Sequence, residues 1–172
     1  MDGQLAKARL GEPNALAALV RAHQRSVYSL ALRMLGTPDL AEDLAQEVFM
    51  QLNASLHMIE SGKHMVFWLR QVTTRRAIDQ LRRRSRVEMT AFDEDTQLFS
   101  TEDGGDPLLR RHLRLLISEL SPPARAVLLL RYQEDLDPMD IARALDMPIN
   151  TVKSHLKRSL DALRQSIEEH ST

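Results

Sequence analysis

The sequence lacks several features that would indicate particular classes of protein. It has no cysteine among its 172 residues, which excludes disulfides, thiolate chemistry and cysteine-based zinc sites. No apolar run approaches the roughly 20 residues needed to span a bilayer, and the N-terminus lacks the basic-then-apolar pattern of a secretory signal. We therefore expect a cytoplasmic protein with no membrane insertion.

Motifs for catalysis and for cofactor binding are missing as well. The six histidines form no HExxH motif, and the sequence has no glycine-rich phosphate loop and no nucleophile elbow. Asp43 and Glu47 lie one helical turn apart, a spacing that suits two ligands of a divalent cation, but no third ligand accompanies them. The sequence predicts no enzyme, no metal site and no cofactor.

The chain has no excess of either charge, since 23 basic residues nearly balance 24 acidic ones. The charges are nevertheless unevenly distributed. Residues 1–86 contain 13 basic and 8 acidic side chains, residues 87–106 contain no basic and seven acidic ones, and residues 107–172 contain 10 and 9. Seven arginines lie between Arg70 and Arg86, with Asp79 the only acid among them. This pattern predicts a first domain that meets a polyanion, with nucleic acid the first candidate.

Apolar residues recur at helical spacing through the first segment and predict three helices there. The first ends at Gly36, a residue typical of the position after a helix. Thr37 is expected to cap the second helix and Pro38 to occupy its first position. A polar break at residues 60–63 precedes a third helix over about 66–84, in which Trp68 is expected to be a core residue rather than a surface for stacking.

Helical periodicity resumes at Leu109, after a glycine-rich loop signal. Residues 121–123 are expected to cap and open one helix, residues 137–140 a short second one ending at Leu145, and residues 150–151 a last one. The short helix and the last helix together match helix-turn-helix organisation. The outer face of the last helix is polar and cationic and is a candidate DNA-binding surface: Thr151, Lys153, Ser154, His155, Lys157 and Arg158.

These patterns predict an all-α protein of two small helical domains, over residues 1–86 and 107–172, joined by an acidic flexible linker over residues 87–106. Twenty extended residues span about 66 Å. The linker is therefore long enough to let the two domains bind separate sites on DNA. Composition leaves open whether it is a solvated spacer or a segment that folds back on the arginines through Asp93, Glu94 and Asp95. Mimicry of nucleic acid is a further role, which only the family resemblance below implies.

Several motifs, in order, resemble those of extracytoplasmic-function (ECF) sigma factors of bacterial RNA polymerase, in the sigma-70 family. The resemblance covers nearly the whole chain and rests on residues 39–49 (DLAEDLAQEVF), 67–69 (FWL), 77–79 (AID) with the arginines, 120–122 (LSP), 140–142 (DIA) and 150–154 (NTVKS). It implies sigma region 2 in the first domain, region 4 in the second, and no region 3 between them. It also implies promoter-specific transcription initiation.

The resemblance implies three binding surfaces. One would bind RNA polymerase core at the β′ clamp helices: Asp39, Glu42, Asp43, Gln46 and Glu47. A second would recognise and open the minus-10 promoter element: Ser61, Lys63, His64, Arg75, Arg76, Asp79, Arg82 and Arg83. The third, on the last helix, would recognise the minus-35 element. The β flap of polymerase and an anti-sigma factor are further partners that the resemblance implies.

The chain departs from the family pattern at four positions. Relatives commonly have Asn at Arg75, Ala at Thr73, Gly at Asp146 and Ser at Pro148, so the base preference does not transfer directly. The residues alone also fit another class, a free-standing helix-turn-helix regulator with an N-terminal protein-interaction domain. In that reading the acidic face of the second helix is an ordinary solvated surface.

Overall fold

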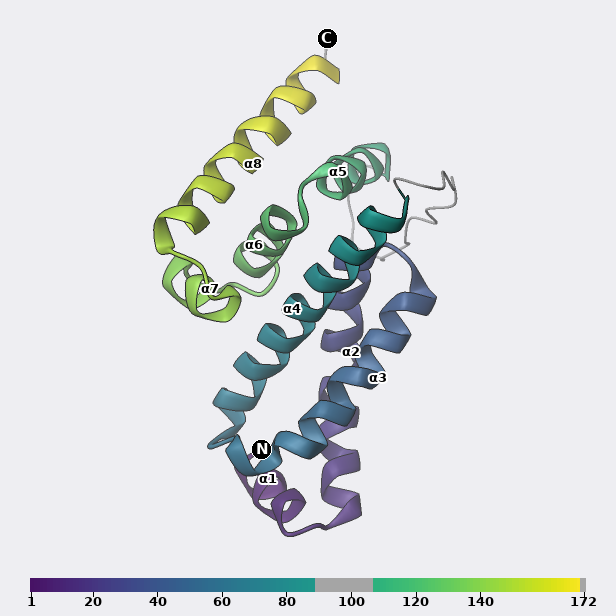
Figure 1. Cartoon of the computed structure of the whole chain (residues 1–172), viewed down its shortest axis with the longest axis vertical. Coiled ribbons are helices and arrows are strands. Elements are labelled where there is room, and N and C mark those ends of the chain that lie inside the picture. Colours follow the sequence, from purple (N-terminus) through teal and green to yellow (C-terminus); the bar gives the residue numbers. More distant parts are fainter. Residues whose placement is uncertain (89–106, 171–172) are drawn as a thin grey trace. The chain divides into compact units, whose positions relative to one another are not determined.

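A computed structural model describes residues 1–88 and 107–170 of the chain (Figure 1). These residues form α-helices and one short 3₁₀ helix joined by turns, and the described part contains no β-strand. The chain divides into two compact units, Met1–Ala77 and Ile78–Thr172, with the division inside one long helix. The elements are α1 (Asp2–Arg9), α2 (Pro13–Leu35), α3 (Pro38–Ser55), η1 (Leu56–Met58), α4 (Gly62–Glu88), α5 (Pro107–Glu119), α6 (Pro122–Tyr132), α7 (Pro138–Leu145) and α8 (Ile149–His170).

The all-α fold predicted from the sequence is confirmed. The predicted linker begins inside α4, which continues to Glu88. The rest of that segment, with Asp93, Glu94 and Asp95, lies outside the described residues. The domain limits drawn from the charge pattern stay a prediction.

The first unit is built around α2 and α3, which pack against each other (Figure 1). The predicted turn between them is present, because Gly36 adopts the left-handed conformation (φ 83°) that ends α2 and Pro38 opens α3. The predicted cap is wrong. Thr37 makes no capping hydrogen bond, and its buried Oγ1 has no partner among the described residues. The hydroxyl of Thr37 is thus buried by packing and does not cap the first turn of α3.

The sequence did not predict α1, a short helix with only two buried residues, Leu5 and Ala8. These two side chains are 1% and 6% exposed, and α1 packs on α2. Two buried positions in eight residues are too few to show helical periodicity, which explains why the pattern was missed.

The third predicted helix starts earlier than expected. It begins at Gly62 and not near residue 66, so the second half of the predicted polar break at residues 60–63 already belongs to the first turn of α4. Trp68 is buried, 9% exposed, and is a core residue as expected.

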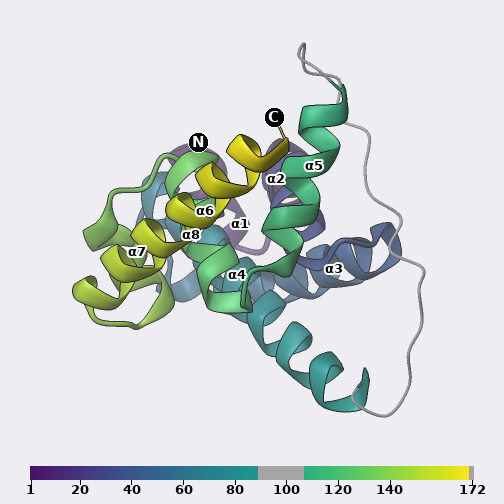
Figure 2. The same cartoon turned by 90° about the horizontal axis from the view of Figure 1, so that it is seen from above.

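The second unit contains α5 to α8, with α6 packed against both α7 and α8 (Figure 2). Arg125 is buried near the start of α6 and donates from Nε to the carbonyl of Ile117 (3.2 Å) and from its guanidinium to the carbonyl of Ser118. It therefore closes the C-terminal end of α5, where carbonyls lack helical partners. The predicted helix openings are correct in place, but Ser121 makes no side-chain cap. Asp137 does: it caps α7.

Candidate polymerase and nucleic-acid interfaces

The outer face of α3 is acidic and solvent-exposed. The inner face of the helix is buried, with Ala41, Leu44 and Val48 each 2% exposed or less. Because helical residues three and four apart share a face, this packing turns the predicted polymerase-binding residues outward together. All five are exposed: Asp39, Glu42, Asp43, Gln46 and Glu47.

One residue of this face, Glu47, is joined to α4. The guanidinium of Arg76 donates from Nη1 to Glu47 Oε2 (2.7 Å) and from Nε to Gln51 Oε1 (2.8 Å). Arg76 is also predicted to contact minus-10 DNA, which stays a prediction; here its side chain contacts α3. Because the two side chains of the ion pair are 40% and 58% exposed, water screens the interaction.

The outer face of α4 carries the arginines. Arg75, Asp79, Arg82 and Arg83 are exposed, whereas Arg76 is half-buried. Spacings of three, four and seven place Arg75, Asp79 and Arg82 on one face of the helix. This exposed face carries two guanidinium groups and one carboxylate, and the part of it that would bind a polyanion stays a prediction.

Thr73 and Thr74 lie on the inner side of α4 and are fully buried. Each hydroxyl donates back to the carbonyl four residues earlier: Thr73 Oγ1 to Leu69 O and Thr74 Oγ1 to Arg70 O, both 2.7 Å. The Thr73 hydroxyl has its hydrogen-bond partner within its own helix. This buried position, where relatives have Ala, can therefore hold a threonine.

The start of α4 is capped by side chains. Ser61 Oγ accepts from the backbone N–H of His64 (3.1 Å), and His64 Nδ1 accepts from the backbone N–H of Glu60 (3.2 Å). This reciprocal arrangement resembles a capping box. Ser61, Lys63 and His64 are the residues of the predicted minus-10 surface that lie at this turn. Ser61 and His64 shape the turn, while Lys63 is exposed.

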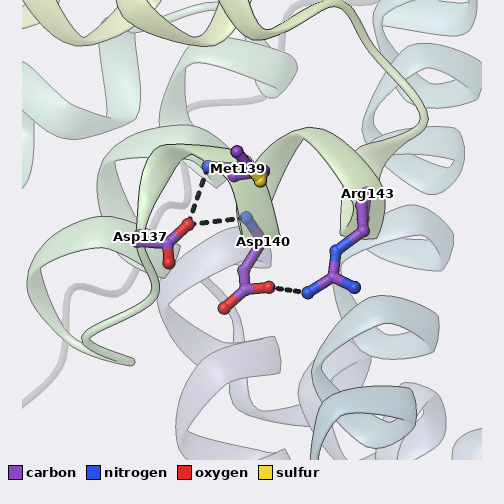
Figure 3. Close-up of polar contacts among 4 residues, drawn as sticks. All are labelled: Asp137, Met139, Asp140 and Arg143. Atoms are coloured by element: carbon purple, nitrogen blue, oxygen red, sulfur yellow. Dashed lines mark hydrogen bonds and ion pairs between the residues drawn. The ribbon is translucent and has the colours of Figure 1, made fainter.

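Local contacts hold the starts of α7 (Figure 3) and α8. Asp137 Oδ1 accepts from the N–H groups of Met139 and Asp140, both at 2.8 Å. Asp146 adopts the left-handed conformation (φ 52°) in the turn where relatives have Gly. At the start of α8 the carbonyl of Pro148 accepts from the N–H groups of Thr151 (2.9 Å) and Val152 (3.2 Å). The departures from the family pattern therefore leave the helix-turn-helix intact.

The predicted DNA-reading face of α8 is exposed at five of its six positions: Thr151, Lys153, Ser154, Lys157 and Arg158. His155 is half-buried. Burial first, and then the charge of Arg158, lower the pKa of His155 below its usual value. Its imidazole is therefore neutral at pH 7, where it acts as one donor and one acceptor.

Sequence reasoning missed a candidate on α7. Arg143 forms an ion pair with Asp140, and its side chain is 70% exposed (Figure 3). The first helix of such a motif crosses the DNA backbone, so an exposed arginine there suits a phosphate. The signal was the spacing of three between Asp140 and Arg143, which places a carboxylate and a guanidinium side by side on one helix.

The described residues contain neither a membrane-spanning helix nor a cluster of metal ligands. Across residues 1–88 and 107–170, no helix is both long and apolar enough to cross a membrane. The same residues contain no group of three or more potential metal ligands.

Comparison with protein families provides the decisive observation. The model for sigma-70 region 2 matches residues 19–87, and the model for sigma-70 region 4 matches residues 110–163. The two matches occur in family order and together cover well over half of the chain. The chain belongs to the sigma-70 family.

Relatives place this sigma factor among the ECF type. It is 34% identical over 160 residues to the ECF RNA polymerase sigma factor SigE of Mycolicibacterium smegmatis, covering 90% of this chain and 62% of SigE. It is 26% identical over 183 residues to the ECF sigma factor SigW of Bacillus subtilis, covering 96% of each. The chain thus spans somewhat less than two thirds of the first relative and almost all of the second.

The fold agrees with this assignment. The sigma factor RpoE of Bartonella quintana, solved in complex with the anti-sigma factor NepR, superposes with a TM-score of 0.74. That comparison covers 88% of this chain and 96% of RpoE at 21% identity. In this sigma factor region 2 spans most of α2 to α4, and region 4 spans most of α5 to α8. Sigma factors are non-enzymatic transcription-initiation factors.

Proposed function

We propose that this sigma factor binds RNA polymerase core in the cytoplasm and directs it to promoters with a minus-10 and a minus-35 element, without catalysing a reaction itself. One observation carries the proposal. Three charged faces lie on three different helices, acidic on α3 and cationic on α4 and α8, within the two family regions in their proper order.

The acidic face of α3 is the proposed surface for the β′ clamp helices. Carboxylates from Asp39, Glu42 and Asp43 would meet basic or hydrogen-bond-donating groups, and Gln46 supplies an amide that both donates and accepts. Long-range attraction of this kind speeds association and weakens with salt. Core binding should therefore be faster at low ionic strength.

The exposed face of α4 is the proposed surface for the minus-10 element. Arg75, Arg82 and Arg83 would neutralise phosphates of the separated strand, and the carboxylate of Asp79 would accept from a base amino group. Arg76 links this face to α3 through Glu47, so we assign it first to holding the two helices in register. The turn at Ser61, Lys63 and His64 completes the surface where a base leaves the stack.

The N-terminal half of α8 is the proposed surface for the minus-35 element. Recognition helices contact bases from this end, and five exposed residues between Thr151 and Arg158 supply hydroxyls and cations. Arg143 on α7 would add a phosphate contact. The proposed domain limits remain 1–86 for region 2 and 107–172 for region 4, with the β flap as a further partner of region 4.

An anti-sigma factor is a candidate partner. The support is that RpoE of Bartonella quintana, which shares this fold, was solved with one. Co-purification from the native host would identify it.

Reconstitution tests the proposed function. The purified chain is mixed with core polymerase, and transcription starts are mapped genome-wide on naked DNA. We expect starts that share two upstream elements, together with a stable complex with core. DNA binding without a core complex would overturn the proposal and favour a free-standing helix-turn-helix regulator.

A further inference from the structure

The N-terminal helix α1 lies outside the region 2 match, which begins at residue 19. It is nevertheless tied to both ends of the segment that leads into α4. Arg9 donates from Nε to the carbonyl of Leu56 (3.1 Å), and Asp2 Oδ1 accepts from the backbone N–H of Gly62 (2.6 Å). Leu56 opens η1 and Gly62 opens α4. The helix therefore brackets the turn between them.

The contact of Asp2 has a clear electrostatic basis. The first N–H groups of a helix lack partners within the helix, and its N-terminal end attracts negative charge. In α4 the carboxylate of Asp2, from another helix, satisfies the N–H of Gly62, while Ser61 satisfies that of His64. A charge-assisted bond and a local cap together fix this turn.

Gly62 permits the close approach of α1. A Cβ atom at Gly62 would lie 3.0 Å from Cγ and Sδ of Met1 and 3.1 Å from Oδ1 of Asp2. Gly3 provides a contrast, because a Cβ atom there would meet nothing within 4 Å. Leu5 and Ala8 are buried and anchor α1 on α2, so a group added at Gly62 would displace the side chains of Met1 and Asp2 before it displaced the helix.

We propose that α1 is a positioning element for minus-10 recognition: Asp2 and Gly62 hold the turn at residues 61–65 in the geometry that receives the unstacked base. This inference rests on the proposed function. Capture of a flipped base requires a preformed pocket, and supporting contacts determine whether the residues that line it are held in place. Ordering the turn before DNA arrives also removes an entropic cost of binding.

The experiment uses the full chain with core polymerase on a promoter obtained by start mapping. Four variants are compared: Asp2→Ala, Asp2→Asn, Gly62→Ala and, as the matched control, Gly3→Ala. Fluorescence of 2-aminopurine in the non-template strand reports opening of the minus-10 element. Transcription from promoters substituted at single minus-10 or minus-35 bases reports discrimination at each element.

We expect Asp2→Ala to reduce opening about tenfold, the loss of one charge-assisted hydrogen bond, and Gly62→Ala to reduce it less, because the atoms nearest to its new Cβ belong to the movable side chains of Met1 and Asp2. Both should also reduce discrimination at the minus-10 element and leave minus-35 discrimination and core affinity unchanged. Asp2→Asn should fall between Asp2→Ala and the parent, because the amide oxygen still accepts while the charge is lost. Gly3→Ala should match the parent in every assay.

The outcomes distinguish a failure of the proposed function from a failure of the proposed role of α1. If the parent chain forms no complex with core and supports no promoter-dependent starts, the proposed function fails and this inference fails with it. If the parent is active and the Asp2 and Gly62 variants match it, only the role of α1 is overturned. A uniform loss at both elements would show a general folding defect instead and would also contradict the proposal. If Gly62→Ala melts below the assay temperature, the Asp2 variants alone decide.

Discussion

The two helices proposed to read promoter DNA start in different ways. The start of α4 is held by Ser61 and by Asp2, a residue 60 positions away in the sequence. The start of α8 is held by the carbonyl of Pro148, only three and four residues from the N–H groups it binds. The first turn of α8 is therefore held by local hydrogen bonds, whereas the first turn of α4 also receives one from a distant part of the chain. The hydrogen bonds at the start of α8 join residues close in the sequence and can be expected from it. The contact between Asp2 and Gly62 cannot.

The largest effects should come from reversing charge on each helix separately. Arg82→Glu with Arg83→Glu should reduce minus-10 opening on the order of a hundredfold and spare minus-35 affinity. Lys157→Glu with Arg158→Glu should reduce minus-35 affinity and spare minus-10 opening. Each pair of reversals replaces two phosphate contacts by repulsion. Arg164→Glu, on an exposed position further along α8, is the control. Opening assays and fluorescence anisotropy on a minus-35 duplex would measure the two effects, and equal loss in both assays would remove the division of labour.

The local start of α8 should be easier to improve than that of α4. Pro148→Ser introduces a side-chain cap worth about 1 kcal/mol. Asp146→Gly relieves the left-handed conformation by up to about 1 kcal/mol, and Asp146→Val should instead destabilise the turn. Thermal unfolding with a probe in the second unit would measure all three. We expect the stabilised variants to bind the minus-35 duplex normally. If no variant changes the stability of the second unit, the start of α8 depends on more than its own turn.

The ion pair between Arg76 and Glu47 should contribute a smaller amount. A double-mutant cycle with Arg76→Gln and Glu47→Gln should give a coupling of about 0.5–1 kcal/mol in the free energy of unfolding, because both side chains are partly solvated. The coupling should decrease at high salt. Additive effects would mean that the two residues act separately and that the ion pair does not help to hold α3 and α4 together.

The smallest effect concerns pH. His23 lies buried in α2, its Nε2 has no partner among the described residues, and burial lowers its pKa in the folded state. The unfolded chain therefore takes up a proton near pH 6.5 while the folded chain does not. The free energy of unfolding should fall as pH drops below about 6.5, until the folded pKa is reached. His23→Leu should reduce this pH dependence in urea unfolding curves. An unchanged slope would assign it to other groups, among them His155, whose pKa is also lowered.

The contrast between α4 and α8 also explains which parts of the molecule the sequence predicted. Gly36, Pro38 and Asp137 act on their immediate neighbours, and the elements they delimit were predicted correctly. Thr37 and Ser121 were expected to cap in the same way, but a cap requires a side-chain orientation that packing can override. The early start of α4 could not be read from the sequence, because Asp2 reaches it through a helix with too few apolar residues to be recognised.

The predicted site residues show the same limit. The exposure of the acidic face of α3 could be predicted from the helical spacing of its apolar residues, since every third or fourth residue faces the core. The engagement of Arg76 with Glu47 could not be inferred, because it depends on how α3 and α4 pack. The partial burial of His155 could not be inferred for a similar reason. Helical spacing places His155 on the polar face of α8, but neighbouring residues partly cover it.

The affinity of the sigma factor for core polymerase tests the central claim most directly. Glu42→Lys with Asp43→Lys reverses two exposed carboxylates on α3, and Glu12→Lys with Asp161→Lys reverses two exposed carboxylates elsewhere. If α3 binds core, the first pair should raise the Kd for core at least tenfold while the affinity of the full chain for a minus-35 duplex stays unchanged. The control pair should leave the Kd for core as it was. Equal affinity for core in the parent and the α3 variant would contradict the assignment of α3 as the polymerase-binding surface.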